Sequence, residues 1–222
     1  MVAGTGHDFM NRHSCKDGIF IRTTFLKDIV WDLNDTKKLG APDGSVKFGA
    51  GVVFSEAHNS SAKMNRIISS GWASTVGVVG WAIGGGHGPL APALGLGVDN
   101  ILEVDMILAN GTSITINANT NTDLFWAIRG GGGSTWGVIT AITYKAHKIP
   151  AQGFTVQTLS WNSTFCQDGK ANLSDLFDRF TEWSTSLNQS WGGLAFFTPA
   201  YYAGSPCSGT WRADLIYIYQ GG

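Results

Sequence analysis

The stretch from Gly71 to Gly97 constrains the fold more than any other part of the sequence. It holds nine of the 30 glycines, and the longer span from Gly71 to Gly137 holds fifteen. Glycine is concentrated where the backbone adopts positive φ or lets a ligand approach closely, because it has no Cβ. Backbone N–H groups exposed in this way bind anions, above all phosphates. A set of tight turns between strands is the alternative, but two further clusters, Gly4–His7 and Arg129–Gly133, favour a cofactor site.

The common phosphate-binding motifs do not describe this stretch. A P-loop requires GxxxxGK followed by Ser or Thr, and no glycine here precedes Lys-Ser or Lys-Thr. Gly86–Ala91 matches the dinucleotide pattern GxGxxA, which functions only where its last residues open a helix. Pro89 and Pro92 disfavour a helix at that point. The sequence therefore predicts an extended, glycine-lined loop and not a Rossmann turn.

The composition of the 222 residues argues against two kinds of partner. With 15 basic and 16 acidic residues, the formal charge of −1 gives no electrostatic attraction to nucleic acid or to an anionic membrane. No apolar run approaches the ~18 residues of a membrane span. Charged residues are 14% of the chain and aromatic residues 12%, which suits a well-buried, β-rich protein with an apolar ligand cavity.

Asn-x-Ser/Thr triplets suggest a glycosylated protein that is secreted or passes through the secretory pathway. The triplets begin at Asn34, Asn59, Asn110, Asn162, Asn172 and Asn188. Cys166 and Cys207 stand in polar, turn-like surroundings and could pair, which leaves Cys15 over. No signal peptide precedes His7, so an extracellular location is expected only if the chain is incomplete.

Alternating and β-branched runs predict a first part, residues 1–150, that is rich in strands. The expected strands are residues 18–22, 29–33, 46–53, 101–108, 113–116 and 137–144, with a hairpin turn at Asn110-Gly111. Gly49 and Gly51 indicate a bulge or a close backbone approach. Two helices are expected. They are Ala57–Ile68, capped by Ser55 with Ala62, Ile67 and Ile68 facing inward, and Leu124–Ile128, capped by Thr122 or Asp123.

After Pro150 the pattern predicts a second α+β unit, residues 151–222. It comprises strands at residues 154–161, 194–197 and 213–219 and an amphipathic helix at residues 172–187. Because so few strands seldom close a core alone, this unit is expected to be truncated. Both ends of the chain look cut.

Four segments carry a resemblance to a known family. They are Gly4–Asp8, Thr75–Gly88, Gly95–Asn100, and Asp123–Gly133 with Trp136–Thr140. In this order and spacing the chain resembles the vanillyl-alcohol-oxidase-type flavoproteins, and within them the berberine-bridge-enzyme-like and isoamyl-alcohol-oxidase-like oxidases. The resemblance covers residues 2–150 closely and the remainder loosely. It implies an α+β fold, with a two-subdomain PCMH-type FAD-binding domain that lacks its N-terminal part, followed by the start of an α+β substrate domain.

The cofactor that the resemblance implies is FAD. In the family the first glycine turn wraps the pyrophosphate, and the histidine that matches His7 bonds covalently to a methyl group of the flavin ring. The alternative for His7 is a turn histidine satisfied by hydrogen bonds. The residues implied as cofactor-binding are Gly4, Thr5, Gly6, His7, Asp8, Thr75, Val76, Gly77, Gly80, Gly84, Gly85, Gly86, His87, Gly88, Asp99, Asn100, Gly137, Val138 and Ile139.

Three positions depart from the family pattern or stay ambiguous. Bicovalent members use a cysteine at the position of Ala73, so at most one covalent bond is expected. Trp81 stands where many members have the histidine of a Gly-Gly-His run, and its indole would narrow the pocket, stack on a substrate, or simply pack in the core. His87 is either a family loop residue or a surface histidine beside prolines.

The function that the resemblance implies is oxidation of an alcohol or sugar hydroxyl. Hydride passes to the flavin, and electrons pass on to dioxygen or another acceptor. The family's catalytic base lies in its later parts, so no catalytic residue is named, and no metal is expected. Two alternatives remain: a flavin-binding member without catalysis, and a secreted glycoprotein module that binds carbohydrate through exposed aromatic side chains.

Overall fold

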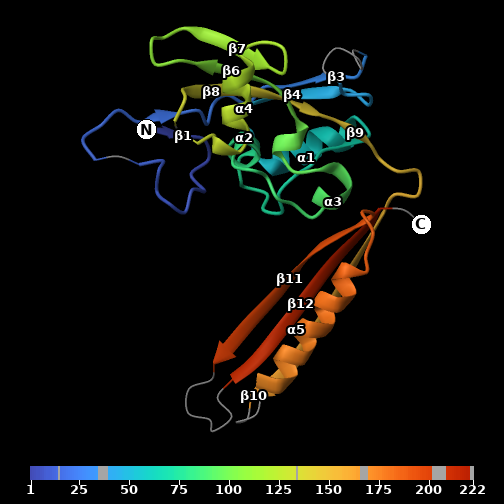
Figure 1. The fold of residues 1–222 in the computed structure, drawn as a ribbon. Coiled ribbons are helices and arrows are strands. Elements are labelled where there is room, and N and C mark those ends of the chain that lie inside the picture. Colours follow the sequence, from blue (N-terminus) through green and yellow to red (C-terminus); the bar gives the residue numbers. More distant parts are fainter. Residues whose placement is uncertain (15, 35–39, 134, 166–169, 202–208, 221–222) are drawn as a thin grey trace. The chain divides into compact units, whose positions relative to one another are not determined.

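The computed structural model describes residues 1–14, 16–34, 40–133, 135–165, 170–201 and 209–220. The chain forms two compact units, Met1–Ile149 and Pro150–Gly222 (Figure 1). Both units combine strands and helices, so the α+β class expected from the sequence is confirmed. The assignment of the first unit to the cofactor and of the second to the substrate stays a prediction.

The first unit is built on an antiparallel sheet of five strands in the order β3-β4-β8-β6-β7. The strands are β3 (Ile29–Asp32), β4 (Ser45–Gly49), β6 (Ile101–Ile107), β7 (Ser113–Asn117) and β8 (Val138–Lys145). All five lie within or close to the predicted ranges, and β6 and β7 form the predicted hairpin. In β4, Val46 and Phe48 are buried while Lys47 is exposed, because successive side chains point to opposite faces.

Three helices cover one face of this sheet: α1 (Phe54–Lys63), α2 (Val78–Ile83) and α4 (Thr122–Gly131), as Figure 1 shows. Their apolar residues close the core against the inward-facing residues of β4, β6, β7 and β8. The buried core includes Val46, Phe48, Phe54, Ala57, Val78, Val79, Ala82, Ile83, Val104, Met106, Ile116, Phe125, Ile128, Ile142 and Tyr144.

The predicted boundaries of two helices are wrong. The first helix begins after Val53, whose N–H donates to the Glu56 carboxylate, and not after Ser55. It ends at Lys63 because Asn65 adopts a left-handed conformation. Ala62 is therefore exposed, and residues 66–67 form the short strand β5 (Arg66–Ile67) beside β9 (His147–Lys148). The N-cap of α4 is Asn121, one residue before the predicted Thr122.

The glycine stretch is not the extended loop that the sequence predicts. It contains α2, the single turn α3 (Ala91–Leu94) and the 3-10 turn η1 (Val98–Asn100). Proline is tolerated in α3 because Pro92 lies in the first turn, where its missing N–H would have no partner within the helix. Four of the six α2 residues are buried, and this packing outweighs the unfavourable local propensity of the glycines.

A short parallel pair, β1 (Val2–Ala3) and β2 (Ile21–Arg22), precedes the main sheet. The segment after β2 runs close to the end of β4, where the Gly51 N–H donates to the Leu26 oxygen at 2.9 Å. A Cβ on Gly51 would lie 2.5 Å from the Thr23 oxygen, so the predicted close backbone approach is confirmed. This contact holds the segment after β2 against the residues that follow β4.

The second unit has an antiparallel sheet of three strands in the order β10-β12-β11 and one helix. They are β10 (Phe154–Phe165), α5 (Lys170–Thr185), β11 (Trp191–Tyr201) and β12 (Gly209–Gln220). Aromatic pairs join α5 to the sheet, such as Trp183 with Tyr217 at 4.4 Å between ring centroids. All four elements were predicted, although the strands are longer than expected. Cys15, Cys166 and Cys207 lie outside the described residues, so their pairing stays a prediction.

Candidate cofactor site

The first unit contains a cavity of about 550 Å³ between stretches that are far apart in the sequence. The Gly4–Asp8 turn lies on it, and so does the segment that leads into α2. The lining residues are Val2, Ala3, Gly4, Thr5, Gly6, His7, Asp8, Phe9, Arg12, His13, Thr23, Ala50, Ala73, Val76, Gly77, Val79, Gly80, Trp81, Ile83, Gly133, Gly137 and Ile139. The hydrophobic members of this list surround a space suited to a largely apolar molecule.

The turn that delivers His7 begins directly after β1. Thr24 Oγ1 donates to the Gly4 oxygen at 3.1 Å, and Gly6 adopts a φ of +85°, which favours glycine. His7 Nε2 then lies 3.0 Å from Thr75 Oγ1, although the two residues are 68 positions apart. The Gly4–His7 cluster and the Gly71–Gly97 stretch therefore meet at this hydrogen bond.

The segment before α2 is held by residues 52–54, at the start of α1. The Phe54 N–H donates to the Val76 oxygen at 3.0 Å, and the Val78 N–H donates to the Val52 oxygen at 3.0 Å. This antiparallel bridge places Gly77 at the N-terminal end of α2, against the Thr5 side chain. The backbone at the centre of the site is thus fixed by hydrogen bonds.

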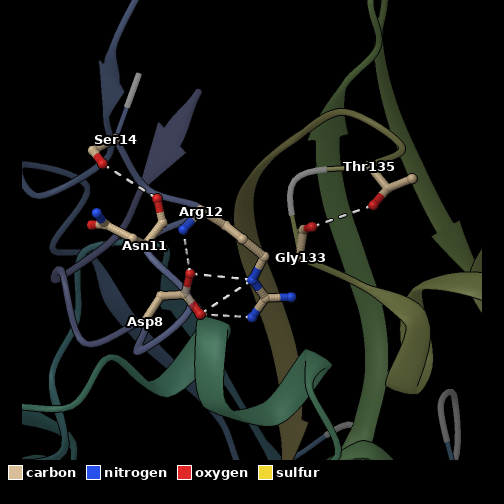
Figure 2. Close-up of polar contacts among 6 residues, drawn as sticks. All are labelled: Asp8, Asn11, Arg12, Ser14, Gly133 and Thr135. Atoms are coloured by element: carbon tan, nitrogen blue, oxygen red, sulfur yellow. Dashed lines mark hydrogen bonds and ion pairs between the residues drawn. The ribbon is translucent and has the colours of Figure 1, made fainter. Parts of the chain in front are cut away.

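An ion pair fixes the outer part of the turn, as Figure 2 shows. Arg12 Nη2 donates to Asp8 Oδ1 at 2.7 Å, and the Arg12 backbone N–H donates to Asp8 Oδ2 at 2.7 Å. The side-chain hydrogen bond from Arg12 lowers the pKa of Asp8 to about 2. The guanidinium also approaches the glycine loop, since a Cβ on Gly133 would lie 3.5 Å from Arg12 Nη1.

Arg12 and His13 line the cavity, but the sequence analysis did not assign them to the site. Their position directly after the Gly4–Asp8 turn is the signal that could have found them. His13 Nδ1 is buried and has no hydrogen-bond partner in the described part of the chain. A buried polar nitrogen of this kind is costly unless a ligand or water satisfies it. It is one observation that fits a polar ligand in this cavity.

Trp81 contributes one side of the cavity while most of its indole is packed. Its ring meets Phe54 edge to face, with 5.1 Å between centroids. A Cβ on Gly86 or Gly97 would lie 2.9 or 2.7 Å from the indole. Of the three alternatives that the sequence leaves open for Trp81, the structure shows packing against the core. Its side chain also borders the cavity.

The predicted site residues divide into two groups. Those that line the cavity are Gly4, Thr5, Gly6, His7, Asp8, Val76, Gly77, Gly80, Gly137 and Ile139, and Thr75 is hydrogen-bonded to one of them. Those that do not line it are Gly84, Gly85, Gly86, His87, Gly88, Asp99, Asn100 and Val138.

Several of the predicted residues that do not line the cavity make hydrogen bonds within their own segment of the chain. Asp99 accepts a hydrogen bond from the Leu96 N–H, and the Asn100 amide donates to the oxygens of Leu94 and Leu96. The Gly97 N–H donates to the Gly86 oxygen at 2.7 Å. His87 is exposed. Their part in binding the cofactor stays a prediction.

A family model described as an FAD binding domain matches residues 1–117. The chain therefore belongs to this FAD-binding family, and its curated relatives are FAD-linked oxidoreductases. The FAD-linked oxidoreductase malF of Malbranchea aurantiaca is 38% identical over 185 residues, which are 79% of this chain and 31% of that protein. Another FAD-linked oxidoreductase, from Arthroderma benhamiae, is 37% identical, and the chain covers 29% of it. The chain therefore spans about a third or less of these curated relatives.

Solved structures support the same fold. BBE-like 1 of Physcomitrella patens has a TM-score of 0.79 and 28% identity, and the match covers 100% of this chain and 43% of that protein. Berberine bridge enzyme from Eschscholzia californica has a TM-score of 0.82 at 23% identity, over 100% of this chain and 41% of that protein. The PCMH-type FAD-binding fold and FAD as the cofactor, both expected from the sequence, are confirmed.

The residues around the cavity fit FAD, which joins a planar, largely apolar ring to an anionic pyrophosphate. A Cβ on Gly6 or Gly80 would meet no protein atom within 4 Å, so these backbones leave open space that a ligand can fill. Within the described ranges, no cluster of His, Cys, Asp or Glu is arranged to hold a metal ion. In the same ranges, none of the helices has the length and hydropathy needed to span a bilayer.

Proposed function

We propose that this chain is the FAD-binding part of an oxidoreductase that oxidises a hydroxyl group of a small alcohol or sugar. The observation that carries the proposal is the cavity in which the Gly4–Asp8 turn meets the segment leading into α2. The bound flavin would accept the hydride of the substrate and pass electrons to dioxygen or another acceptor. The chain's own residues would bind and orient it.

In this proposal the backbones around Gly6 and Gly80 leave room for the cofactor. His7 would hold it through a bond from an imidazole nitrogen to a methyl carbon of the flavin ring, and that linkage would release a proton to solvent and two electrons to dioxygen. Ala73 lines the cavity without a thiol, so a single covalent bond is expected.

Substrate selection would depend partly on Trp81, which borders the cavity beside Ile83 and Ile139. An indole held by Phe54 is a rigid wall and would favour a substrate with a flat or apolar portion. No residue is assigned as the catalytic base. A small-molecule substrate and an electron acceptor are the partners proposed.

The first test is to purify the protein from its natural source and to measure its flavin absorbance near ~450 nm, the region characteristic of oxidised flavin cofactors. The tryptic peptide that ends at Arg12 and contains His7 is then weighed. A flavin band together with an adduct on this peptide would support attachment at His7. A flavin band that is reduced by no alcohol or sugar would favour a non-catalytic flavin protein. Sugar binding without any flavin band would contradict the proposal and favour a carbohydrate-binding module.

A matched pair of variants tests the cavity itself. Gly80→Leu places a side chain where the cavity is open, and we expect FAD content to fall at least about tenfold while the fold is kept, since leucine favours helix. Gly131→Ala, in α4, also meets no protein atom within 4 Å but does not line the cavity. It is expected to keep its FAD. Equal FAD content in both variants would remove this cavity from the proposal.

We also propose that the protein is glycosylated in the secretory pathway. Asn34, Asn59, Asn110 and Asn188 each begin an acceptor triplet and are exposed. Treatment with an amidase that removes N-linked glycans should lower the mass of the natural protein. An unchanged mass would contradict the proposed glycosylation.

A further inference from the structure

We propose that Thr75 is a positioning residue that orients the His7 ring for bond formation with the flavin. The inference rests on the attachment proposed above and concerns the residue that makes it efficient. It is carried by the hydrogen bond between His7 Nε2 and Thr75 Oγ1 at 3.0 Å. In the described part of the chain, Thr75 is the partner of the His7 ring, and no other hydrogen bond to that ring is present.

Thr75 is held firmly enough to orient another side chain. The carbonyl oxygens on either side of it, those of Ser74 and Val76, accept hydrogen bonds from Ser55 and Phe54 at the start of α1. These distances are 2.9 and 3.0 Å. The hydroxyl therefore projects from a backbone that is anchored on the core, although the side chain itself lies at the surface.

His7 is held from the other side by its own turn. Gly4 is bound by Thr24 on one flank, and Asp8 is fixed by Arg12 on the other. The His7 side chain is exposed. In the described part of the chain, the hydrogen bond to Thr75 is the polar contact that orients the imidazole.

The nitrogen that can react follows from the chemistry of imidazole. A neutral ring carries one N–H and one lone pair, and only the nitrogen with the lone pair can attack an electrophilic carbon. The Thr75 hydroxyl can donate or accept, so it engages Nε2 in both tautomers. In the tautomer in which Nε2–H donates to Thr75 Oγ1, the free lone pair is on Nδ1, and the geometry assigns bond formation to this nitrogen. The same logic orients histidines at metal sites through a partner on the other nitrogen.

The test is the rate at which flavin becomes attached to the whole protein. Samples taken after synthesis begins are digested, and the fraction of the peptide ending at Arg12 that carries flavin is measured by mass. Thr75→Val keeps the shape and loses the hydroxyl, and we expect attachment to slow by roughly tenfold, the factor for the loss of one modest interaction. Thr75→Ser keeps the hydroxyl and is expected to restore most of the rate. Thr24→Val removes the hydroxyl that donates to the Gly4 oxygen and controls for general disturbance of the Gly4–Asp8 turn, so it is expected to slow attachment less than Thr75→Val does.

Reversible binding separates positioning from simple binding. In a His7→Ala background, where no attachment occurs, the change in Kd for FAD on adding Thr75→Val measures direct binding by Thr75, and attachment rates are then compared at FAD concentrations that saturate both proteins. Attachment in Thr75→Val at the wild-type rate under saturating FAD, or an adduct found on Nε2, would overturn the inference. Absence of any adduct in the wild-type protein is a different result, since it would overturn the proposed attachment itself while leaving FAD binding intact.

Discussion

At the scale of single residues, His147 shows how a partly buried network disfavours a charge. Its Nε2–H donates to Asn100 Oδ1 at 2.7 Å, and the Asn100 amide nitrogen donates to the oxygens of Leu94 and Leu96. These two bonds orient the amide so that its oxygen faces the imidazole. Burial lowers the pKa of His147 below its ordinary value, and Lys145 lowers it further, against an opposing effect of Asp43.

This network predicts a pH dependence of stability. The unfolded chain takes up a proton at His147 near pH ~6.5, whereas the folded chain takes it up only at lower pH. The unfolded state therefore binds more protons in that interval, and stability contributed by neutral His147 is lost as pH falls below ~6.5. Urea unfolding between about pH 7.5 and pH 5.5 should show a smaller loss in His147→Gln, which keeps a donor for Asn100. Identical pH slopes in the two proteins would contradict this role.

At the scale of elements, the glycines around α2 make room for one side chain. Gly97 is buried, and a Cβ there would lie 2.7 Å from the Trp81 ring and 2.9 Å from the Gly86 Cα. The turn from α3 to η1 can pack on α2 only because these positions lack side chains. The glycine pattern suggests a phosphate loop, but Gly86 and Gly97 are required because the Trp81 indole packs against their backbone.

Gly97→Ala is expected to destabilise the first unit by about 1–3 kcal/mol, the usual effect of overpacking a filled core. Its neighbours are backbone atoms and a ring held by Phe54, so they have little room to move. Denaturant unfolding measures the change. Gly131→Ala is the control, since its Cβ meets nothing within 4 Å, and a similar loss in both variants would show that the effect is not overpacking.

The elements also show what the sequence can predict and what it cannot. Strands such as β4 and β8 alternate buried and exposed residues or are rich in β-branched ones, and they were predicted within a few residues. The helices α2 and α3 were missed because glycine and proline disfavour helix locally, while burial of residues such as Val79 and Ala82 favours it. Only the folded chain contains the contacts that decide between these effects.

The site was predictable to a similar degree. The Gly4–Asp8 turn and Val76, Gly77 and Gly80 lie on the cavity, as the glycine pattern of these segments suggested. Arg12 and His13 were missed because no periodic or capping pattern points to them. Gly84–Gly88 were predicted to bind the cofactor but do not line the cavity. The sequence alone does not distinguish a glycine required for backbone packing from a glycine required for ligand binding.

At the scale of the whole molecule, all residues that line the cavity belong to the unit Met1–Ile149. A ligand stabilises the structure that binds it by RT ln(1 + [L]/Kd), which is about 2.7 kcal/mol at about 100 times Kd. FAD binding should therefore stabilise this unit more than residues 150–222. The His7→Ala variant binds the cofactor reversibly in our proposal, which makes the comparison possible.

Hydrogen exchange of His7→Ala, read peptide by peptide with and without FAD, measures this difference. Amides of β4, β6 and β8 that exchange only through unfolding of the unit should slow by up to about a hundredfold at that concentration. Amides of β10, β11 and β12 should slow by a much smaller factor, because no residue of that unit lines the cavity in the described structure. Equal protection of both units would mean that FAD binding is coupled to the second unit as strongly as to the first. The cavity in the first unit would then be only part of the cofactor site.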